Sequence, residues 1–134
     1  MDEITLASSA KEQLIDITPQ AEDAVRRSGI MDGLVHLWCN HTTAGLTINE
    51  NADPDVKTDI LLALRAIVPD NMSYRHAEGN SPAHVKSSLM GCQLSVPVVN
   101  GRLALGTWQG ILFCEFDGPR PARRVRLAFI QSVA

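Results

Sequence analysis

The residues best suited to chemistry in this sequence are three histidines in polar surroundings. His41 directly follows the apolar run 33–40, at a strand end of the kind on which functional side chains are usually mounted. His76 and His84 flank a polar segment that contains Glu78. Three imidazoles can hold a divalent metal and leave one coordination position open. The alternative is three surface histidines, and their spacing alone does not decide between the two.

Acidic and amide side chains lie close to these histidines in the sequence. Asp53 precedes a proline at the start of a predicted helix, so helix capping competes with a catalytic role. Glu50 and Asn51 are not explained by capping, although Asn51 can satisfy its own backbone in a turn. Glu115 lies in an otherwise apolar strand, where we expect an edge-exposed carboxylate. If Glu115 is buried, it must be paired or protonated.

Two further stretches near the C-terminus could contribute to a site. Gly106–Gly110 encloses Trp108 and Gln109 between glycines, which indicates a bulge or a close backbone approach. A basic run follows, and arginine suits bidentate contacts with phosphate. The alternative interpretation of this basic run is a solvent-exposed strand end. The members of this run are Arg120, Arg123, Arg124 and Arg126.

Composition limits the classes of protein to consider. The chain has 134 residues, enough for one domain, and 45% hydrophobic residues can form a core without disulfides. A net charge of -3 argues against a broad nucleic-acid surface. The three cysteines show no CxxC spacing and predict reduced, buried thiols. No signal peptide and no run long enough for a membrane helix is recognised, so we expect a cytoplasmic protein.

Strand patterns and helix patterns occur in blocks along the chain. Residues 3–8 and 12–17 predict a strand pair, and apolar runs predict further strands at 33–40, 44–50, 92–99, 102–106, 110–116 and 123–131. Proline near the start predicts two helices, one from Pro19 with Thr18 as its cap and Gly29 at its end, and one from Pro54 that ends before Pro69. A short helix is expected over 83–91. Because strands and helices do not alternate strictly, we predict a single α+β domain, residues 1–134, built on antiparallel sheet or a sandwich with two or three helices.

Three segments taken together resemble the YjbQ family of small bacterial and archaeal proteins. They are HTTAGLTINENADPDV (41–56), HAEGNSPAHVKSSLMG (76–91) and NGRLALGTWQGILFCEFDGPR (100–120). The resemblance implies a compact α+β domain that assembles as a homotrimer, with a polar pocket near a subunit interface. It also implies a bound metal, held by His41, His76 and His84. Imidazoles suit zinc better than magnesium, so zinc is expected and magnesium is the alternative.

The resemblance extends to the other site residues. The catalytic candidates are Glu78, Glu115, Asp53 and Gln109. The ligand-binding candidates are Thr42, Thr43, Asn51, Asn80 and Arg120. The family is similar to proteins named secondary thiamine-phosphate synthase, which implies joining a pyrimidine diphosphate to a thiazole phosphate with release of pyrophosphate. Further anion contacts could come from Lys57, Arg75, Lys86 and Arg123.

Three hypotheses about function remain open from the sequence. The first is a metal-dependent enzyme that acts on a phosphorylated small molecule, with thiamine-phosphate synthesis as a low, secondary activity. The second is a non-catalytic homotrimer that binds a small ligand in the same pocket. The third is a purely structural role for the polar segments at a trimer interface, which gives no reason for three histidines among so many carboxylates. No nucleic-acid or membrane partner is expected.

Overall fold

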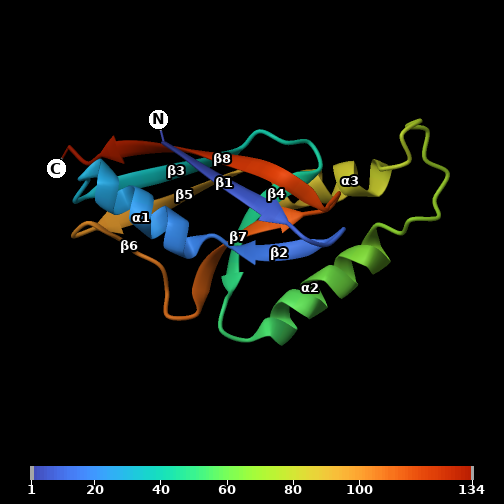
Figure 1. Ribbon diagram of the computed structural model, residues 1–134. Coiled ribbons are helices and arrows are strands. Elements are labelled where there is room, and N and C mark those ends of the chain that lie inside the picture. The colour runs from blue at the N-terminus through green and yellow to red at the C-terminus, as the bar shows by residue number, and fades with distance from the viewer. Residues whose placement is uncertain (1, 134) are drawn as a thin grey trace.

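The computed structural model describes residues 2–133, and Figure 1 shows their arrangement. Helices and strands occur in blocks, as predicted. The strands are β1 (Asp2–Ser8), β2 (Gln13–Asp16), β3 (Gly33–Cys39), β4 (Ala44–Glu50), β5 (Gln93–Val99), β6 (Arg102–Leu103), β7 (Gln109–Glu115) and β8 (Arg120–Gln131). The helices are α1 (Thr18–Ser28), α2 (Pro54–Ile67) and α3 (Ser81–Met90).

The strands form two antiparallel sheets, which confirms the α+β prediction. The larger sheet has the order β1-β8-β3-β5-β6, and the smaller has the order β2-β7-β4. β8 is an inner strand of the larger sheet, because it pairs with both β1 and β3. β7 is the central strand of the small sheet and is almost entirely buried. Central strands buried on both faces are expected to be continuously apolar, as the ILFC segment of β7 is.

The predicted pairing of residues 3–8 with 12–17 is wrong. β1 pairs with β8 in the large sheet, whereas β2 pairs with β7 in the small one. The short connection between β1 and β2 therefore carries the chain from one sheet to the other. Alternation of apolar residues predicted both strands correctly, but it contains no information about which neighbour each strand finds.

Helix ends follow the proline signals, with one difference in capping. Gly29 ends α1 in the left-handed conformation (φ 75°), as the sequence predicts. The side chain of Asp53 accepts a hydrogen bond from the N–H of Asp55 at 2.9 Å, so Asp53 does cap α2. Thr18 is the first residue of α1, not its cap. Its Oγ1 instead accepts a hydrogen bond from the N–H of Ile111 in β7 at 2.8 Å.

Two apolar clusters hold the elements together. The larger lies between the sheets and α1 and includes Val35, Leu37, Phe113 and Leu127. The smaller packs α2 and α3 against the small sheet through Leu14, Leu64, Ala83, Cys114 and Phe116. All three cysteines are free; Cys39 and Cys114 are buried as predicted, whereas Cys92 is half-buried. Burial raises the pKa of the Cys114 thiol to about 12, so it stays protonated at neutral pH.

The polar loop 71–80 and helix α3 form the right-hand end of the molecule in Figure 1. The start of β1 and the end of β8 lie toward the opposite end. α3 packs on β4, where Gly45 allows a close approach. A Cβ added at Gly45 would lie 2.7 Å from the carbonyl oxygen of Gly91. Within residues 2–133, none of the helices has both the length and the apolar character needed to cross a membrane.

We expect Asp53→Ala to lower the free energy of unfolding by about 1 kcal/mol, because it removes the side-chain cap of α2. Urea denaturation followed by circular dichroism measures this difference. Asp59→Ala is the matched control, since Asp59 is exposed in the middle of the same helix. Its effect should stay within about 0.5 kcal/mol. Equal losses in the two variants would contradict a capping role.

Candidate functional site

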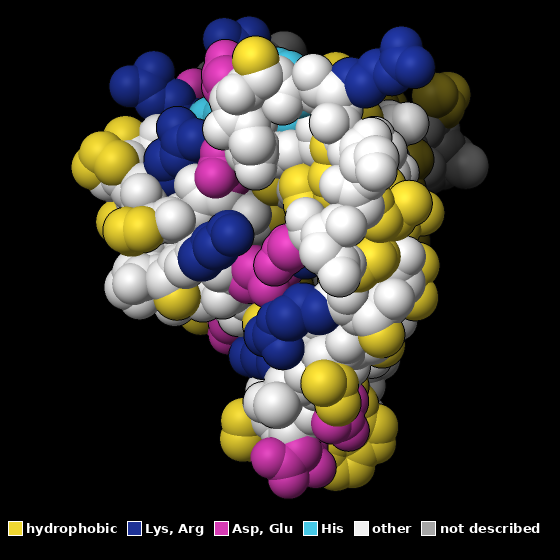
Figure 2. Space-filling view, turned by 90° about the vertical axis from the view of Figure 1, so that its right-hand side faces the viewer, with side chains coloured by type: hydrophobic (Ala, Val, Ile, Leu, Met, Phe, Trp, Pro, Cys, Tyr) yellow, Lys and Arg dark blue, Asp and Glu magenta, His cyan; other side chains and the backbone are white. Residues whose placement is uncertain are grey.

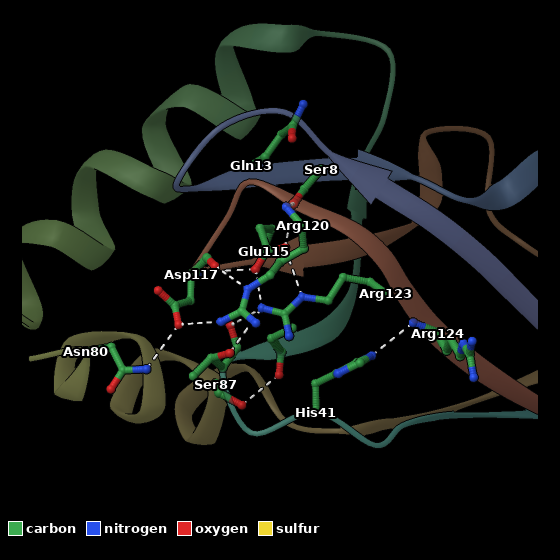
Figure 3. Close-up of polar contacts among 12 residues, drawn as sticks. Ser8, Gln13, His41, Asn80, Ser87, Glu115, Asp117, Arg120, Arg123 and Arg124 are labelled. Atoms are coloured by element: carbon green, nitrogen blue, oxygen red, sulfur yellow. Dashed lines mark hydrogen bonds and ion pairs between the residues drawn. The ribbon is translucent and has the colours of Figure 1, made fainter. Parts of the chain in front are cut away.

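A buried ion pair between Glu115 and Arg123 lies at the centre of the candidate site (Figure 3). Glu115 is the last residue of β7 and is 0% exposed, and Arg123 is 4% exposed. Arg123 faces inward because residues alternate along β8, which places it on the same face as Val125 and Leu127. Its Nε donates to Oε1 of Glu115 at 2.9 Å, and its Nη2 donates to Oε2. The expectation of an edge-exposed Glu115 is therefore wrong, and the paired alternative is confirmed.

Three further residues complete the bonding of this pair. Ser8 donates its hydroxyl to Oε1 of Glu115 at 2.6 Å, and the N–H of Asp117 donates to Oε2 at 3.0 Å. Nη2 of Arg123 also donates to Oγ1 of Thr43 at 3.0 Å. Burial by itself raises the pKa of Glu115, but the hydrogen bonds from Arg123 and Ser8 outweigh it and hold the pKa below its usual value. Glu115 is thus a carboxylate whose two oxygens are both occupied.

One nitrogen of Arg123 remains free of this network. Nη1 has no hydrogen-bond partner among residues 2–133, while Nε and Nη2 are fully engaged. Arg123 also lines a surface hollow of about 440 Å³. A guanidinium that is fixed by its own partners, with one N–H pair facing a hollow, is oriented to receive an anion.

A second series of hydrogen-bonded polar side chains lies along the same hollow, from the start of α3 to the turn before β8. Nδ2 of Asn80 donates to Oδ2 of Asp117 at 3.0 Å, and Nη2 of Arg120 donates to the same oxygen at 2.9 Å. Burial raises the pKa of Asp117, but the bonds from Asn80 and Arg120 bring it below the usual value. Arg120, which lines the hollow, is therefore held in place by Asp117 (Figure 3).

All three histidines line this hollow. The rings of His76 and His84 meet edge to face, with centroids 5.2 Å apart. Nε2 of His76 lies 4.0 Å from Oε2 of Glu78. Figure 2 shows the end of the molecule formed by residues 71–80 and α3. Lys, Arg, Asp and Glu side chains lie close together down the middle of this view.

His41 is engaged differently from the other two histidines. Its Nε2 accepts a hydrogen bond from the backbone N–H of Arg124 at 2.9 Å (Figure 3). Burial lowers the pKa of His41, and the positive charge of Arg123 lowers it further, so the ring is neutral. A neutral imidazole that accepts at Nε2 carries its proton on Nδ1. In this arrangement His41 has no free lone pair for a metal. Among the residues described, no three His, Cys, Asp or Glu side chains are grouped closely enough to hold a metal ion.

The structure brings together most of the predicted site residues. The hollow is lined by His41, Thr42, Thr43, His76, Glu78, Asn80, His84, Arg120 and Arg123, together with Asn40. Glu115 lies beneath it, behind Arg123. The hollow thus combines two guanidinium groups, three imidazoles, one exposed carboxylate and several small polar groups. Such a set can bind an anion and offer imidazole ligands beside it.

Three predicted residues lie elsewhere, at the far end of β4 and β7. The register pairs Ala44 with Glu115 at the hollow and Glu50 with Gln109 at the other end. Seven residues of strand separate these ends by about 20 Å. Gln109 accepts a hydrogen bond from the N–H of Gly106 at 2.8 Å, so it holds its own loop. The other two residues placed there are Asn51 and Asp53, the latter being the cap of α2.

Asn51 has a packing role that explains the glycine-rich segment. A Cβ added at Gly110 would lie 2.6 Å from Cβ of Asn51. The N–H of Asn51 donates to the carbonyl oxygen of Trp108 at 2.9 Å. The close backbone approach predicted for residues 106–110 is therefore present, and it serves this corner of the fold rather than the hollow.

Sequence reasoning missed two residues that build the site. Ser8 lies at the end of β1, and its hydroxyl both donates to Glu115 and accepts from the N–H of Arg120 at 2.9 Å. Asp117 joins Asn80 to Arg120. No local pattern identifies Ser8, because its importance comes entirely from strands that are distant in sequence. Asp117 could have been suspected, since it ends an apolar strand just before the basic run.

The fold and the site together define the class of protein. It is a small α+β domain of two antiparallel sheets, with a polar hollow lined by histidines and arginines at one end. The sequence profile described as "UPF0047 protein YjbQ-like" matches residues 2–132. The chain therefore belongs to the YjbQ (UPF0047) family, as the motifs predicted.

Similar proteins occur in bacteria and archaea. The chain is 51% identical over 118 residues to the UPF0047 protein YugU of Bacillus subtilis, which covers 87% of this chain and 89% of YugU. It is 50% identical over 115 residues to a UPF0047 protein of Methanocaldococcus jannaschii, covering 86% and 83% of the two chains. A crystal structure of a YjbQ/UPF0047 protein from Clostridium acetobutylicum has a TM-score of 0.94 at 52% identity, covering 97% of this chain and 100% of that one.

The fold is retained in more distant relatives. A YbjQ-like protein from Sulfolobus solfataricus, described as of unknown function, is 32% identical and has a TM-score of 0.93, covering 98% and 96% of the two chains. The architecture described above is thus the family architecture.

We expect Arg123→Met to lower the free energy of unfolding by about 3–5 kcal/mol, because it leaves the Glu115 carboxylate buried without its counter-charge. The double variant Arg123→Met/Glu115→Leu should recover much of that loss. Urea denaturation of the two single variants and the double variant forms a double-mutant cycle. Strictly additive losses would contradict the pairing.

The pH dependence gives an independent check on the same pair. A carboxyl whose pKa is lower in the folded state contributes stability above its unfolded pKa, near 4.5, and this contribution is lost as pH falls through the folded value. We expect the unfolding free energy of Glu115→Gln to fall less steeply with acidification below pH 4.5 than that of the unsubstituted protein. Parallel pH profiles would show that Glu115 has no lowered pKa.

Proposed function

We propose that this protein is a small metal-dependent enzyme that acts on a phosphorylated small molecule. The specific form of the proposal is a thiamine-phosphate synthase type of reaction, in which a pyrimidine diphosphate and a thiazole phosphate are joined and pyrophosphate is released. The observation that carries the proposal is the free Nη1 of the buried Arg123, in the same hollow as His41, His76 and His84.

Phosphate is the anion that fits this hollow best. Arg123 cannot turn away, because three of its hydrogen bonds go to Glu115 and Thr43. Arg120 is oriented by Asp117 in the same manner. Guanidinium groups fixed in this way lose little side-chain entropy when they bind oxygen atoms. Thr42 is exposed at the hollow and adds a hydroxyl donor, and Asn40 adds an amide donor.

A divalent metal, zinc by the chemistry of its ligands, completes the proposal. His76 and His84 are close enough to share a metal after small side-chain rotations, and Glu78 is their nearest carboxylate. His41 can join them only if its ring gives up the hydrogen bond from Arg124. Zinc would supply a Lewis acid beside the anion. Magnesium, which prefers oxygen ligands and retains water, is the alternative.

The residues of the chain would divide the work between binding and proton transfer. Arg120 and Arg123 bind and orient the phosphate oxygens, and they favour charge that develops on a leaving pyrophosphate. Glu78 is the carboxylate available to accept a proton, because its side chain is 75% exposed at the hollow. Glu115 is not suited to that role, since both its oxygens are engaged. We assign Glu115 the positioning of Arg123.

Zinc content tests the metal part of this proposal. The protein, purified and dialysed against zinc, should retain zinc. His84→Ala should lower the affinity by more than the roughly tenfold to hundredfold that loss of an outer-shell partner costs. Elemental analysis and competition with a chromogenic chelator measure this. His36→Ala is the matched control, because His36 lies in β3 and bonds to Ser95 away from the hollow. Full zinc retention by His41→Ala, His76→Ala and His84→Ala would refute the metal site.

Pyrophosphate release from the two thiamine precursors tests the reaction. Arg120→Met should lower kcat/KM by about tenfold to a hundredfold, as expected for one charge-assisted hydrogen bond. Binding of the precursors without pyrophosphate release would favour the alternative function, a non-catalytic ligand-binding homotrimer.

Assembly of the homotrimer has its own support in the large sheet. The outer face of this sheet exposes Trp38 by 42%, Leu34 by 38% and Ile130 by 55%, with a groove of about 210 Å³ beside Trp38. Apolar side chains clustered in this way usually mark a protein–protein interface. We propose that this face packs against identical chains. The three free thiols, of which Cys39 and Cys114 are buried, support the cytoplasmic location that we also propose.

Trp38→Asp should convert the trimer to monomers, because it puts a charge into the proposed interface. Sedimentation equilibrium measures the mass, and Met72→Asp, on an exposed loop, is the control. An unchanged mass for Trp38→Asp would exclude this face as the interface.

A further inference from the structure

A second cleft lies directly beside the hollow and has no role in the function proposed so far. Its volume is about 490 Å³, and it is bordered by α2, α3, the β1–β2 connection and the residues after β7. The two spaces share Glu78 and Asn80 in their walls. We propose that this cleft is a second anion subsite centred on Lys86, so that the protein holds two phosphorylated molecules side by side. This inference rests on the proposed function, because a reaction that joins two phosphorylated substrates needs a place for each.

Lys86 is the buried charged group at the centre of the proposed subsite. Its side chain is 4% exposed, and its Nζ donates to Oε2 of Glu12 at 2.6 Å. An ammonium group has three N–H donors, and no other partner of Nζ exists among residues 2–133. Buried donors without an acceptor cost free energy, which an anionic ligand would recover. Lys86 nevertheless lines an open cleft, so an acceptor can reach it.

The cleft is lined by three cations, Lys11, Arg65 and Lys86, and four carboxylates, Glu12, Asp70, Glu78 and Asp117, and its positive charge is concentrated around Lys86. Nε of Arg65 donates to Oε1 of Glu12 at 2.8 Å, so one carboxylate is shared by two cations and a positive charge is left over. Lys11 lines the same cleft, is exposed, and has no ion-pair partner in the described part of the chain. The other three carboxylates of the cleft repel a bound anion only weakly. Asp70 and Glu78 are exposed and screened by solvent, and Asp117 is neutralised by Arg120.

The wall between the cleft and the hollow keeps the two anions apart while leaving them neighbours. It is built by Asn80 and Asp117, which are hydrogen-bonded to each other. Arg120 and Arg123 face the hollow, whereas Lys86 and Lys11 face the cleft. Each space therefore has its own basic groups, and neither has to accommodate both negative charges. The ligands that fit are two separate small phosphate esters, with their reacting ends meeting near Asn80 and Glu78.

Titration with inorganic phosphate, followed by the amide signals of the labelled full-length protein, tests this directly. Two saturable binding events per chain are expected. One should shift the amides around Thr43 and Arg124 at the hollow, and the other those around Gly79, Ala83 and Phe116 at the cleft. Shifts confined to the hollow, or a stoichiometry of one phosphate per chain, would overturn the proposal.

Substitutions assign the two events. Lys86→Met should weaken the cleft event by roughly tenfold or more, because it removes a charge-assisted hydrogen bond and keeps the apolar stem. Lys11→Met should weaken the same event to a smaller extent. It provides the test if Lys86→Met does not fold, since Lys11 is exposed. Arg120→Met should weaken the hollow event. Arg102→Met is the matched control and should change neither event, because Arg102 is exposed in β6 and lines neither space. An unchanged cleft event in both lysine variants would overturn the assignment.

The outcomes separate this inference from the proposed function. Retained zinc and phosphate at the hollow without phosphate at the cleft would remove the second subsite alone. Phosphate at the cleft, with neither zinc nor phosphate at the hollow, would instead refute the proposed function and leave the cleft as an independent anion site.

Discussion

The ion pair of Glu115 and Arg123 is the interaction on which the rest of this end of the molecule depends. It joins the last residue of β7, in the small sheet, to β8, in the large one. Ser8 and Thr43 bond to the same pair and tie in the end of β1 and the turn before β4. Two buried charges are costly to desolvate, and here each is compensated by several hydrogen bonds. The pair thus fixes four chain segments in one place.

The orientation of the free guanidinium nitrogen follows from this constraint. Because Glu115 and Thr43 occupy Nε and Nη2 of Arg123, only Nη1 is left to face the hollow. The carboxylate therefore acts on any ligand through Arg123 rather than by direct contact. Fold stability and anion binding would depend on the same pair, so a substitution there affects both. If the proposed anion binding holds, this coupling is a reason for a charged pair in the core of a small domain, where an apolar pair costs less to bury.

The two ends of the β4–β7 pair have different roles, and this is the second organising feature of the structure. One end, with Ala44 opposite Glu115, opens into the hollow and the neighbouring cleft. The other end, with Glu50 opposite Gln109, is closed by the tight contact of Gly110 with Asn51 and by the cap of α2. The polar residues between β3 and α2 therefore serve two purposes. Those at the beginning line a candidate site, and those at the end build a corner of the fold.

The sequence by itself determined the elements, the fold class and the family. Apolar alternation, proline at helix starts and Gly29 at a helix end are local signals, and each was sufficient to place a strand or a helix. The motifs also implied a metal held by His41, His76 and His84; the three side chains line one hollow, and metal binding stays a prediction. Only the tertiary structure decided the pairing partners of β1 and β2, the burial of Glu115 and Lys86, and the role of Ser8. Each of these depends on contacts between segments far apart in the chain, and a pattern of neighbouring residues contains no information about such contacts.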